Sequence, residues 1–240
     1  TMKKVVMTGC LAIALLFAGR ANAQTYAEVE KTTSETPWSI EITSGNLVNG
    51  FNWGTASLRG RYFISDKLGI RLQLGLGDGS GKPMTDKNNY YENADGTGGV
   101  GTEKISRSAV SLQIGAEYHF IGTKKLDPYA ALGIDFGFGG QKSEGDKVDP
   151  VLSAYNKDYK YNGAGKYSSM GGTLALGADF YFVENVFIGL EAGLGFHALS
   201  FKDAESEVTI TGIPPIKNVT PAYKRNHLGT HAVVRLGWRF

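Results

Sequence analysis

Apolar and polar residues alternate with a period of two along most of the chain. The stretch GIRLQLGLG at 69–77, for example, places Ile70, Leu72 and Leu74 on one side and Arg71 and other polar or small residues on the opposite side. Such alternation indicates a β-strand with two different faces. The same pattern predicts eight strands, at 38–44, 56–63, 69–77, 109–120, 129–140, 172–182, 186–197 and 231–240.

The connections between these strands alternate between short and long. Tight turns are expected at 65–67, 122–127 and 183–185. Long, polar loops are expected at 45–54, 79–103, 141–167 and 202–225. Long loops without secondary structure are uncommon in a compact soluble domain, whereas a transmembrane β-barrel combines short turns at one end with long loops at the other. The pattern therefore favours an all-β, eight-stranded antiparallel up-and-down transmembrane β-barrel with short periplasmic turns and long extracellular loops.

The N-terminus has the features of an export signal. Lys3 and Lys4 precede the apolar stretch 5–19, and the sequence ANA at 21–23 resembles a cleavage site. The alternative is a transmembrane anchor, but an apolar run of this length is shorter than the roughly 18 residues that a spanning helix needs. The predicted organisation is a signal peptide at 1–23, a short periplasmic segment at 24–35 and the barrel at 36–240.

Composition and charge narrow the class further. Glycine accounts for 33 of 240 residues, about twice its usual share of roughly 7%. The predicted signal peptide contains three basic residues and no acidic one, so the count of 25 basic and 23 acidic residues becomes 22 and 23 without it. A chain with this balance has no general attraction for nucleic acid. No nucleic-acid partner is therefore expected.

The two faces of the predicted strands differ in the size of their side chains. The apolar face is large and uniform, whereas the other face is small, polar and rich in glycine, as expected of the narrow interior of an eight-stranded barrel. Because an unpaired buried charge is costly, the inward charges are expected to form a balanced ion network that plugs the lumen; the alternative is that several are solvated near the rims. The expected network residues are Glu41, Arg59, Arg61, Arg71, Glu117, Asp135, Asp179, Glu191, Arg235 and Arg239.

The four even-numbered strands end on closely spaced aromatic residues, so these side chains are expected at one rim. Because aromatic residues favour the membrane–water interface and the signal peptide delivers the N-terminus to the periplasm, this rim is assigned to the periplasmic side. The expected rim residues are Tyr62, Tyr118, Phe120, Phe180, Phe182, Trp238 and Phe240. The last strand must then close onto the first near 38–42.

Together, the strand ends GAEYHF and GADFYF and the final strand HAVVRLGWRF resemble the outer membrane β-barrel domain family of Bacteroidetes, and more broadly the small OmpX, OmpA-domain and OmpW-like eight-stranded barrels. The resemblance covers about residues 36–240. It implies that the last strand is read by the barrel assembly machinery. The residues that match this assembly signal are Val234, Leu236, Gly237, Trp238 and Phe240, with Ala232 at the start of the same alternation.

The functional expectation is a non-enzymatic outer membrane protein with a structural or surface-interaction role. The resemblance also leaves open the passage of small hydrophobic molecules and a place in an envelope secretion machine. A lipid A-modifying enzyme is a remote alternative, because His197 and Ser200 are three apart and point to opposite faces of a strand. No cofactor, metal site or catalytic residue is expected. Expected partners are outer membrane lipids and lipopolysaccharide, the assembly machinery, and a surface ligand or envelope protein.

Overall fold

The computed structural model describes residues 36–44, 57–76 and 84–240. The predicted signal peptide, the segment 24–35 and the loop 45–54 lie outside the described residues. Every described element is a β-strand. The strands are β1 (Trp38–Thr43), β2 (Ser57–Ser65), β3 (Leu68–Leu76), β4 (Thr85–Tyr91), β5 (Val100–His119), β6 (Leu126–Asp149), β7 (Ala154–Val183), β8 (Val186–Phe201), β9 (Ala204–Ile210), β10 (Ile213–Thr220) and β11 (Tyr223–Arg239).

Eight of these strands form a closed antiparallel ring. The order is β1, β2, β3, β5, β6, β7, β8 and β11, and β11 pairs with β1 to complete the ring. At the closing seam, Trp38 N donates to Phe240 O at 3.1 Å and Phe240 N donates to Trp38 O at 2.8 Å. The prediction that the last strand closes onto the first near 38–42 is therefore confirmed.

The ring is staggered, so that rows of paired residues climb around it. One such row contains a residue of every ring strand, namely Glu41, Arg59, Gln73, Gln113, Asp135, Gly171, His197 and His227. Glu41 also pairs with Gly237 of β11, ten residues along the strand from His227. This displacement is the shear that a ring of tilted strands requires. Because of this shear, the interior row lies nearer the short turns at Glu41 and nearer the extension at His227.

The faces of the ring follow the alternation of the sequence. The aliphatic side chains of one face are exposed on the outside, as for Leu72 (53%) and Leu174 (59%). The other face points inward, where Arg71 and Asp179 are fully buried. Inward glycines make space for these large side chains: a Cβ at Gly189 would lie 2.6 Å from both Arg235 Nη2 and Asp179 Oδ1. The expectation that glycine relieves crowding inside the ring is met at this position.

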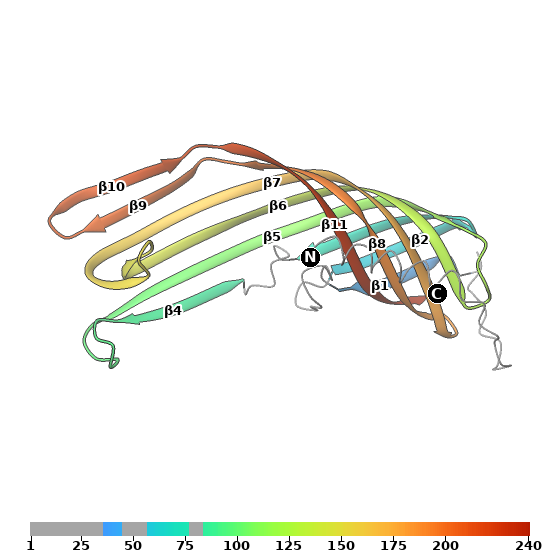
Figure 1. The fold of residues 1–240 in the computed structure, drawn as a ribbon, viewed down its shortest axis with the longest axis horizontal. Coiled ribbons are helices and arrows are strands. Elements are labelled where there is room, and N and C mark those ends of the chain that lie inside the picture. Colours follow the sequence, from blue (N-terminus) through green and yellow to red (C-terminus); the bar gives the residue numbers. More distant parts are fainter. Residues whose placement is uncertain (1–35, 45–56, 77–83) are drawn as a thin grey trace, which may run out of the picture.

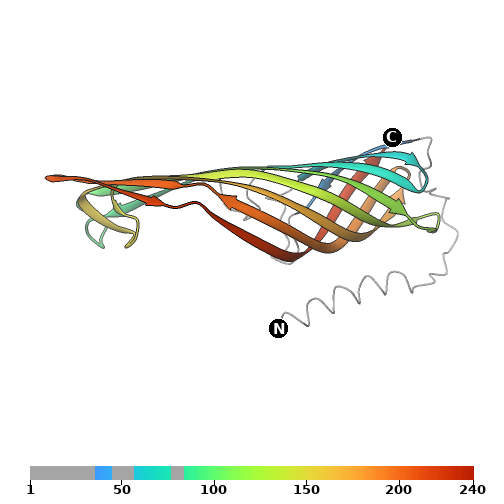
Figure 2. The ribbon, with the colours of Figure 1, turned by 90° about the horizontal axis from the view of Figure 1, so that it is seen from above.

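The connections at one end are short, as predicted, but the expected long loops are mostly strands. Between β2 and β3, and between β7 and β8, only two residues lie outside the strands. In contrast, β5, β6 and β7 continue well past the ring, and the regions expected to be loops at 79–103, 141–167 and 202–225 contain these continuations together with β4, β9 and β10. Figures 1 and 2 show this curved sheet, the extension, reaching away from one end of the ring.

The physical reason for this error is that hydrophobic alternation detects only strands with one apolar face. Within the extension, residues such as Lys160 and Asn162 alternate with tyrosines, so both faces carry polar groups. Backbone pairing nevertheless continues without interruption from Ser143↔Gly163 to Asp146↔Lys160. At the outer edge, β10 pairs with β9 and contains the prolines at 214–215, where its register with β9 is irregular.

Candidate functional site: an ion network inside the ring

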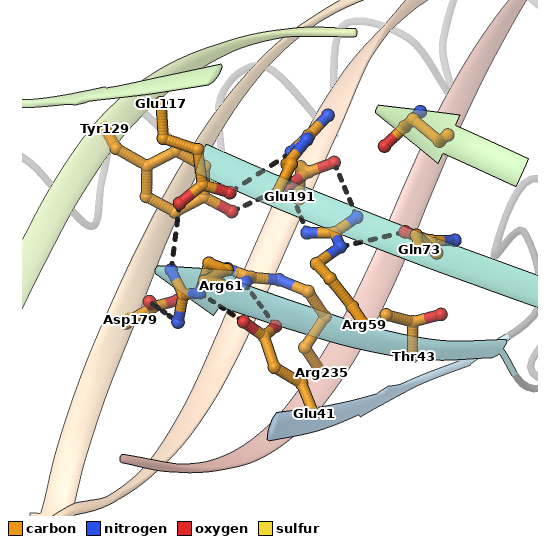
Figure 3. A network of polar contacts seen from close by, with 12 residues as sticks. Glu41, Thr43, Arg59, Arg61, Gln73, Glu117, Tyr129, Asp179, Glu191 and Arg235 are labelled. Carbon is orange, nitrogen blue, oxygen red and sulfur yellow. Dashed lines mark hydrogen bonds and ion pairs between the residues drawn. The ribbon is translucent and has the colours of Figure 1, made fainter. Parts of the chain in front are cut away.

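The interior of the ring contains a continuous network of buried ion pairs (Figure 3). Arg61 of β2 is at its centre. Its Nη2 lies 2.8 Å from Asp179 Oδ2, its Nη1 lies 3.1 Å from Glu117 Oε2, and its Nε contacts Glu41. The side chains of all four residues are fully buried. A single guanidinium thus holds carboxylates from β1, β5 and β7 together.

A second arginine binds two of these carboxylates from the strand on the other side of β1. Arg235 of β11 places Nη1 2.7 Å from Glu41 Oε2 and Nη2 2.5 Å from Asp179 Oδ1. Its guanidinium also lies 5.1 Å from the centre of the Tyr129 ring. Glu41 and Asp179 are each shared by two arginines, and such sharing stabilises charges that water no longer solvates.

Glu191 of β8 connects this cluster to the upper part of the interior. Its carboxylate lies 2.8 Å from both Arg59 Nη1 and Arg71 Nη1, and it accepts a hydrogen bond of 2.7 Å from the Tyr129 hydroxyl. Arg71 in turn lies 3.4 Å from Glu117. Every strand of the ring contributes to the network, which consists of Glu41, Arg59, Arg61, Arg71, Glu117, Tyr129, Asp179, Glu191 and Arg235.

Two of the ten charged residues expected in the network have other neighbours. Asp135 accepts hydrogen bonds from Gln113 Nε2 at 2.6 Å and from Thr173 Oγ1 at 2.5 Å. Arg239, near the turn end, donates to Thr36 O at 2.8 Å and places its guanidinium 3.7 Å from the centre of the Phe63 ring.

The set of expected network residues omitted three interior groups, which are Tyr129, His119 and Asp127. Tyr129 binds Glu191, and His119 lies 3.0 Å from Asp127 and 3.4 Å from Glu117. Tyr129 and Asp127 have the same strand parity as the inward Asp135, so extending the alternation of β6 toward its start would have identified them.

A polar chamber lies above the network. It has a volume of about 230 Å³ and is lined by residues that include Arg59, Asp135, Glu191, His197, His227 and His231. The network forms its floor, because Arg59 and Glu191 belong to both. Ser200 does not line this chamber, although His197 does. Among the described residues, no group of three or more His, Cys, Asp or Glu is arranged to hold a metal ion.

The aromatic residues expected at one rim lie on the outer face near the short turns. Tyr62 packs against Trp38 at a centroid distance of 4.6 Å, and Trp238 lies 5.2 Å from Phe240. The rings of Tyr118 and Phe120 are 5.6 Å apart, and those of Phe180 and Phe182 are also exposed. Val234, Leu236 and Gly237 lie on β11, where Leu236 faces outward and Gly237 lies against the inward Phe187 ring.

No described helix has the length and apolar character to cross a membrane. The family of the chain follows from a sequence match. Residues 52–201, more than half of the chain, match the model of the "Putative OmpA-OmpF-like porin family". The chain belongs to this family, and its closed antiparallel ring is the β-barrel of a porin-like outer membrane protein. A comparison with curated proteins found no match.

Several solved structures are similar to this chain. A major outer membrane protein from Thermus thermophilus has 14% identity, with 85% of this chain and 98% of that chain covered and a TM-score of 0.49. Ail, the attachment invasion locus protein of Yersinia pestis, has 13% identity, coverage of 85% and 97%, and a TM-score of 0.34. CarO of Acinetobacter baumannii has 12% identity, coverage of 85% and 97%, and a TM-score of 0.37.

Proposed function

We propose that this protein is a non-enzymatic outer membrane barrel whose lumen is plugged and whose extension is a surface for contacts outside the cell. In this proposal the signal peptide at 1–23 is removed on export and 24–35 remain in the periplasm. The aromatic rim and short turns face the periplasm, and the extension faces outward. The observation that carries the proposal is the ion network, because its buried side chains come from all eight strands and meet inside the ring.

The plugged lumen rests on the strength of this network. Arg61 and Arg235 share Glu41 and Asp179, so opening a passage would separate several buried charges at once. Leaving one member of a buried ion pair without its partner typically costs about 3–5 kcal/mol. Spontaneous opening that separates more than one pair would therefore be rare.

Single-channel recording in a planar bilayer tests the plug. We expect the purified protein to insert without producing a large, stable conductance step. A reproducible open state of the wild-type protein would refute the plugged lumen. It would favour the second candidate, passage of small molecules, which is supported by membership of a porin-like family and by the polar chamber above the network.

The contact role of the extension is supported by its surface. At the tip of the β6–β7 hairpin, Val151 and Leu152 are 87% and 73% exposed. Tyrosines on β4 and β7 add large amphipathic side chains, of which Tyr90 donates to Glu103 at 3.1 Å. Exposed apolar groups beside tyrosines are typical of protein contact surfaces.

A hairpin replacement tests this role. Because Glu144 pairs with Asn162, replacing residues 145–161 by Asn-Gly joins β6 and β7 through a two-residue turn and keeps their register. We expect this variant to insert normally but to lose any partner that crosslinks to the wild-type protein in native outer membranes. Retention of all partners would refute the contact role of this hairpin. A stoichiometric partner held by both proteins would instead favour a subunit of an envelope secretion machine.

A further inference from the structure

The outer face of β7 changes its chemistry in a fixed order from the short turn toward the extension. On β7, where even-numbered residues point outward, Phe180 lies near the short turn and is followed by Leu174 and Met170, which are all exposed. Beyond Met170 the outward residues become polar, first Ser168 and then Lys166. The order is therefore aromatic, aliphatic, hydroxyl and cationic.

The next two strands of the ring, β8 and then β11, also place a lysine beyond their exposed apolar residues. On β8, the exposed Phe196 is followed by Ser200 and then by Lys202, directly after the strand. On β11, which runs antiparallel to β8, the exposed Leu228 lies on the membrane side of Lys224. Three adjacent strands thus place a lysine at the same height above an apolar surface.

The three lysines lie side by side. Lys202 N donates to Lys166 O at 2.9 Å, and Lys224 pairs with Ser200. All three are exposed, and within the described residues no carboxylate lies at ion-pair distance from any of them. Neighbouring lysines differ, since Lys104 and Lys142 lie 3.5 and 3.0 Å from Glu144. Glu144 lies on the extension, beyond the apolar surface of the ring. The hydrogen bond from Lys142 lowers the pKa of its carboxyl.

The spacing along β7 matches the thickness of a membrane. Ten residues separate Phe180 from Met170, which is roughly 34 Å along a strand and about 26 Å along the membrane normal at a tilt near 40°. The apolar band of such barrels is about 25 Å tall. Lys166 lies four residues farther, about 10 Å above the band, where a lysine side chain reaches the headgroup layer.

We propose that Lys166, Lys202 and Lys224 form a binding site for the phosphomonoester headgroup of an outer-leaflet glycolipid of the lipid A type, whose acyl chains lie against the apolar surface below. This proposal rests on the membrane orientation given under the proposed function. A phosphate monoester carries about 1.5–2 negative charges at neutral pH, so several cations without carboxylate partners are complementary to it. The hydroxyl layer at Ser168 and Ser200 lies at the level of the sugar and ester groups of such a lipid.

The test measures lipid binding to the purified full-length protein in detergent by native mass spectrometry, with lipid A, phosphatidylglycerol and inorganic phosphate as separate probes. The test variant is Lys166→Gln/Lys202→Gln/Lys224→Gln. The control variant makes the same change of charge on the extension, at Lys87, Lys157 and Lys217. A basic residue near an anionic membrane surface increases the binding affinity about fivefold. Loss of three lysines should therefore weaken the binding of lipid A to the test variant by about a hundredfold.

The proposal predicts that the control variant binds lipid A as the wild-type protein does, and that salt weakens binding because the lysines are exposed. Equal affinity of the test variant and the wild-type protein would overturn it, as would equal weakening in both variants. Equal binding of phosphatidylglycerol, or full competition by inorganic phosphate, would overturn the assignment to a phosphomonoester glycolipid. Insertion of each variant into vesicles is measured separately, because failure to insert would instead contradict the membrane orientation.

Discussion

Replacing Arg61 by methionine tests whether the ion network stabilises the barrel. The substitution keeps much of the apolar stem and removes the guanidinium that contacts Glu41, Glu117 and Asp179. Removing one partner of a buried ion pair costs about 3–5 kcal/mol when the other is left unpaired. In this network each carboxylate keeps a second arginine, since Arg235 binds Glu41 and Asp179 and Arg71 binds Glu117. We therefore expect a loss near the lower limit.

The expected loss of unfolding free energy can be converted into a shift of the urea concentration at which half of the protein is unfolded. With a urea dependence of about 2 kcal/mol per molar, a loss of about 3 kcal/mol lowers the unfolding midpoint by roughly 1.5 M. Tryptophan fluorescence reports unfolding, since Trp38 and Trp238 lie on the outer face. Lys217→Met is the matched control, because it removes an exposed cation from β10. A midpoint for Arg61→Met equal to that of the control would refute the view that the network stabilises the barrel.

Three further predictions concern the outer face, the packing inside and assembly. Leu174→Arg should destabilise the inserted barrel by about 2–4 kcal/mol, because an arginine on the lipid side near the middle of the bilayer is poorly solvated; an unchanged vesicle-refolding equilibrium would contradict this. Gly189→Val should lower the urea midpoint, because its side chain would displace Arg235 and Asp179, and a wild-type midpoint would show that the interior adapts. Deleting Phe240 should reduce insertion in cells more than the stability of refolded protein, and normal insertion of the truncated chain would refute its role as an assembly signal.

The sequence predicted the ring because the evidence for it is local. Alternation of apolar and small residues identified every strand of the ring, and short turns at one end implied antiparallel order. The inward position of charges such as Glu41 and Arg71 followed from the same parity. Which acid meets which base did not follow, because the stagger of the ring decides it. Arg59 and Glu191, for example, are 132 positions apart in the chain.

The extension could not be predicted in the same way. Its strands are held by backbone pairing between long neighbours rather than by burial of an apolar face, so polarity suggested loops where β5, β6 and β7 continue. The chamber was also not predicted, although His197 and His227 are both inward in parity. Their meeting across β8 and β11 depends on register, which alternation does not give.

The prolines at 214–215 have a consequence for the behaviour of the molecule at high concentration. Among the described strands β10 pairs only with β9, so its other side is open to a strand of another molecule. Unprotected edges of this kind recruit further strands and lead to aggregation. Proline lacks the backbone N–H that such recruitment needs, and two in succession interrupt the hydrogen-bonding edge of an eight-residue strand. Densely packed copies of this protein could therefore keep their long sheets exposed without joining them edge to edge.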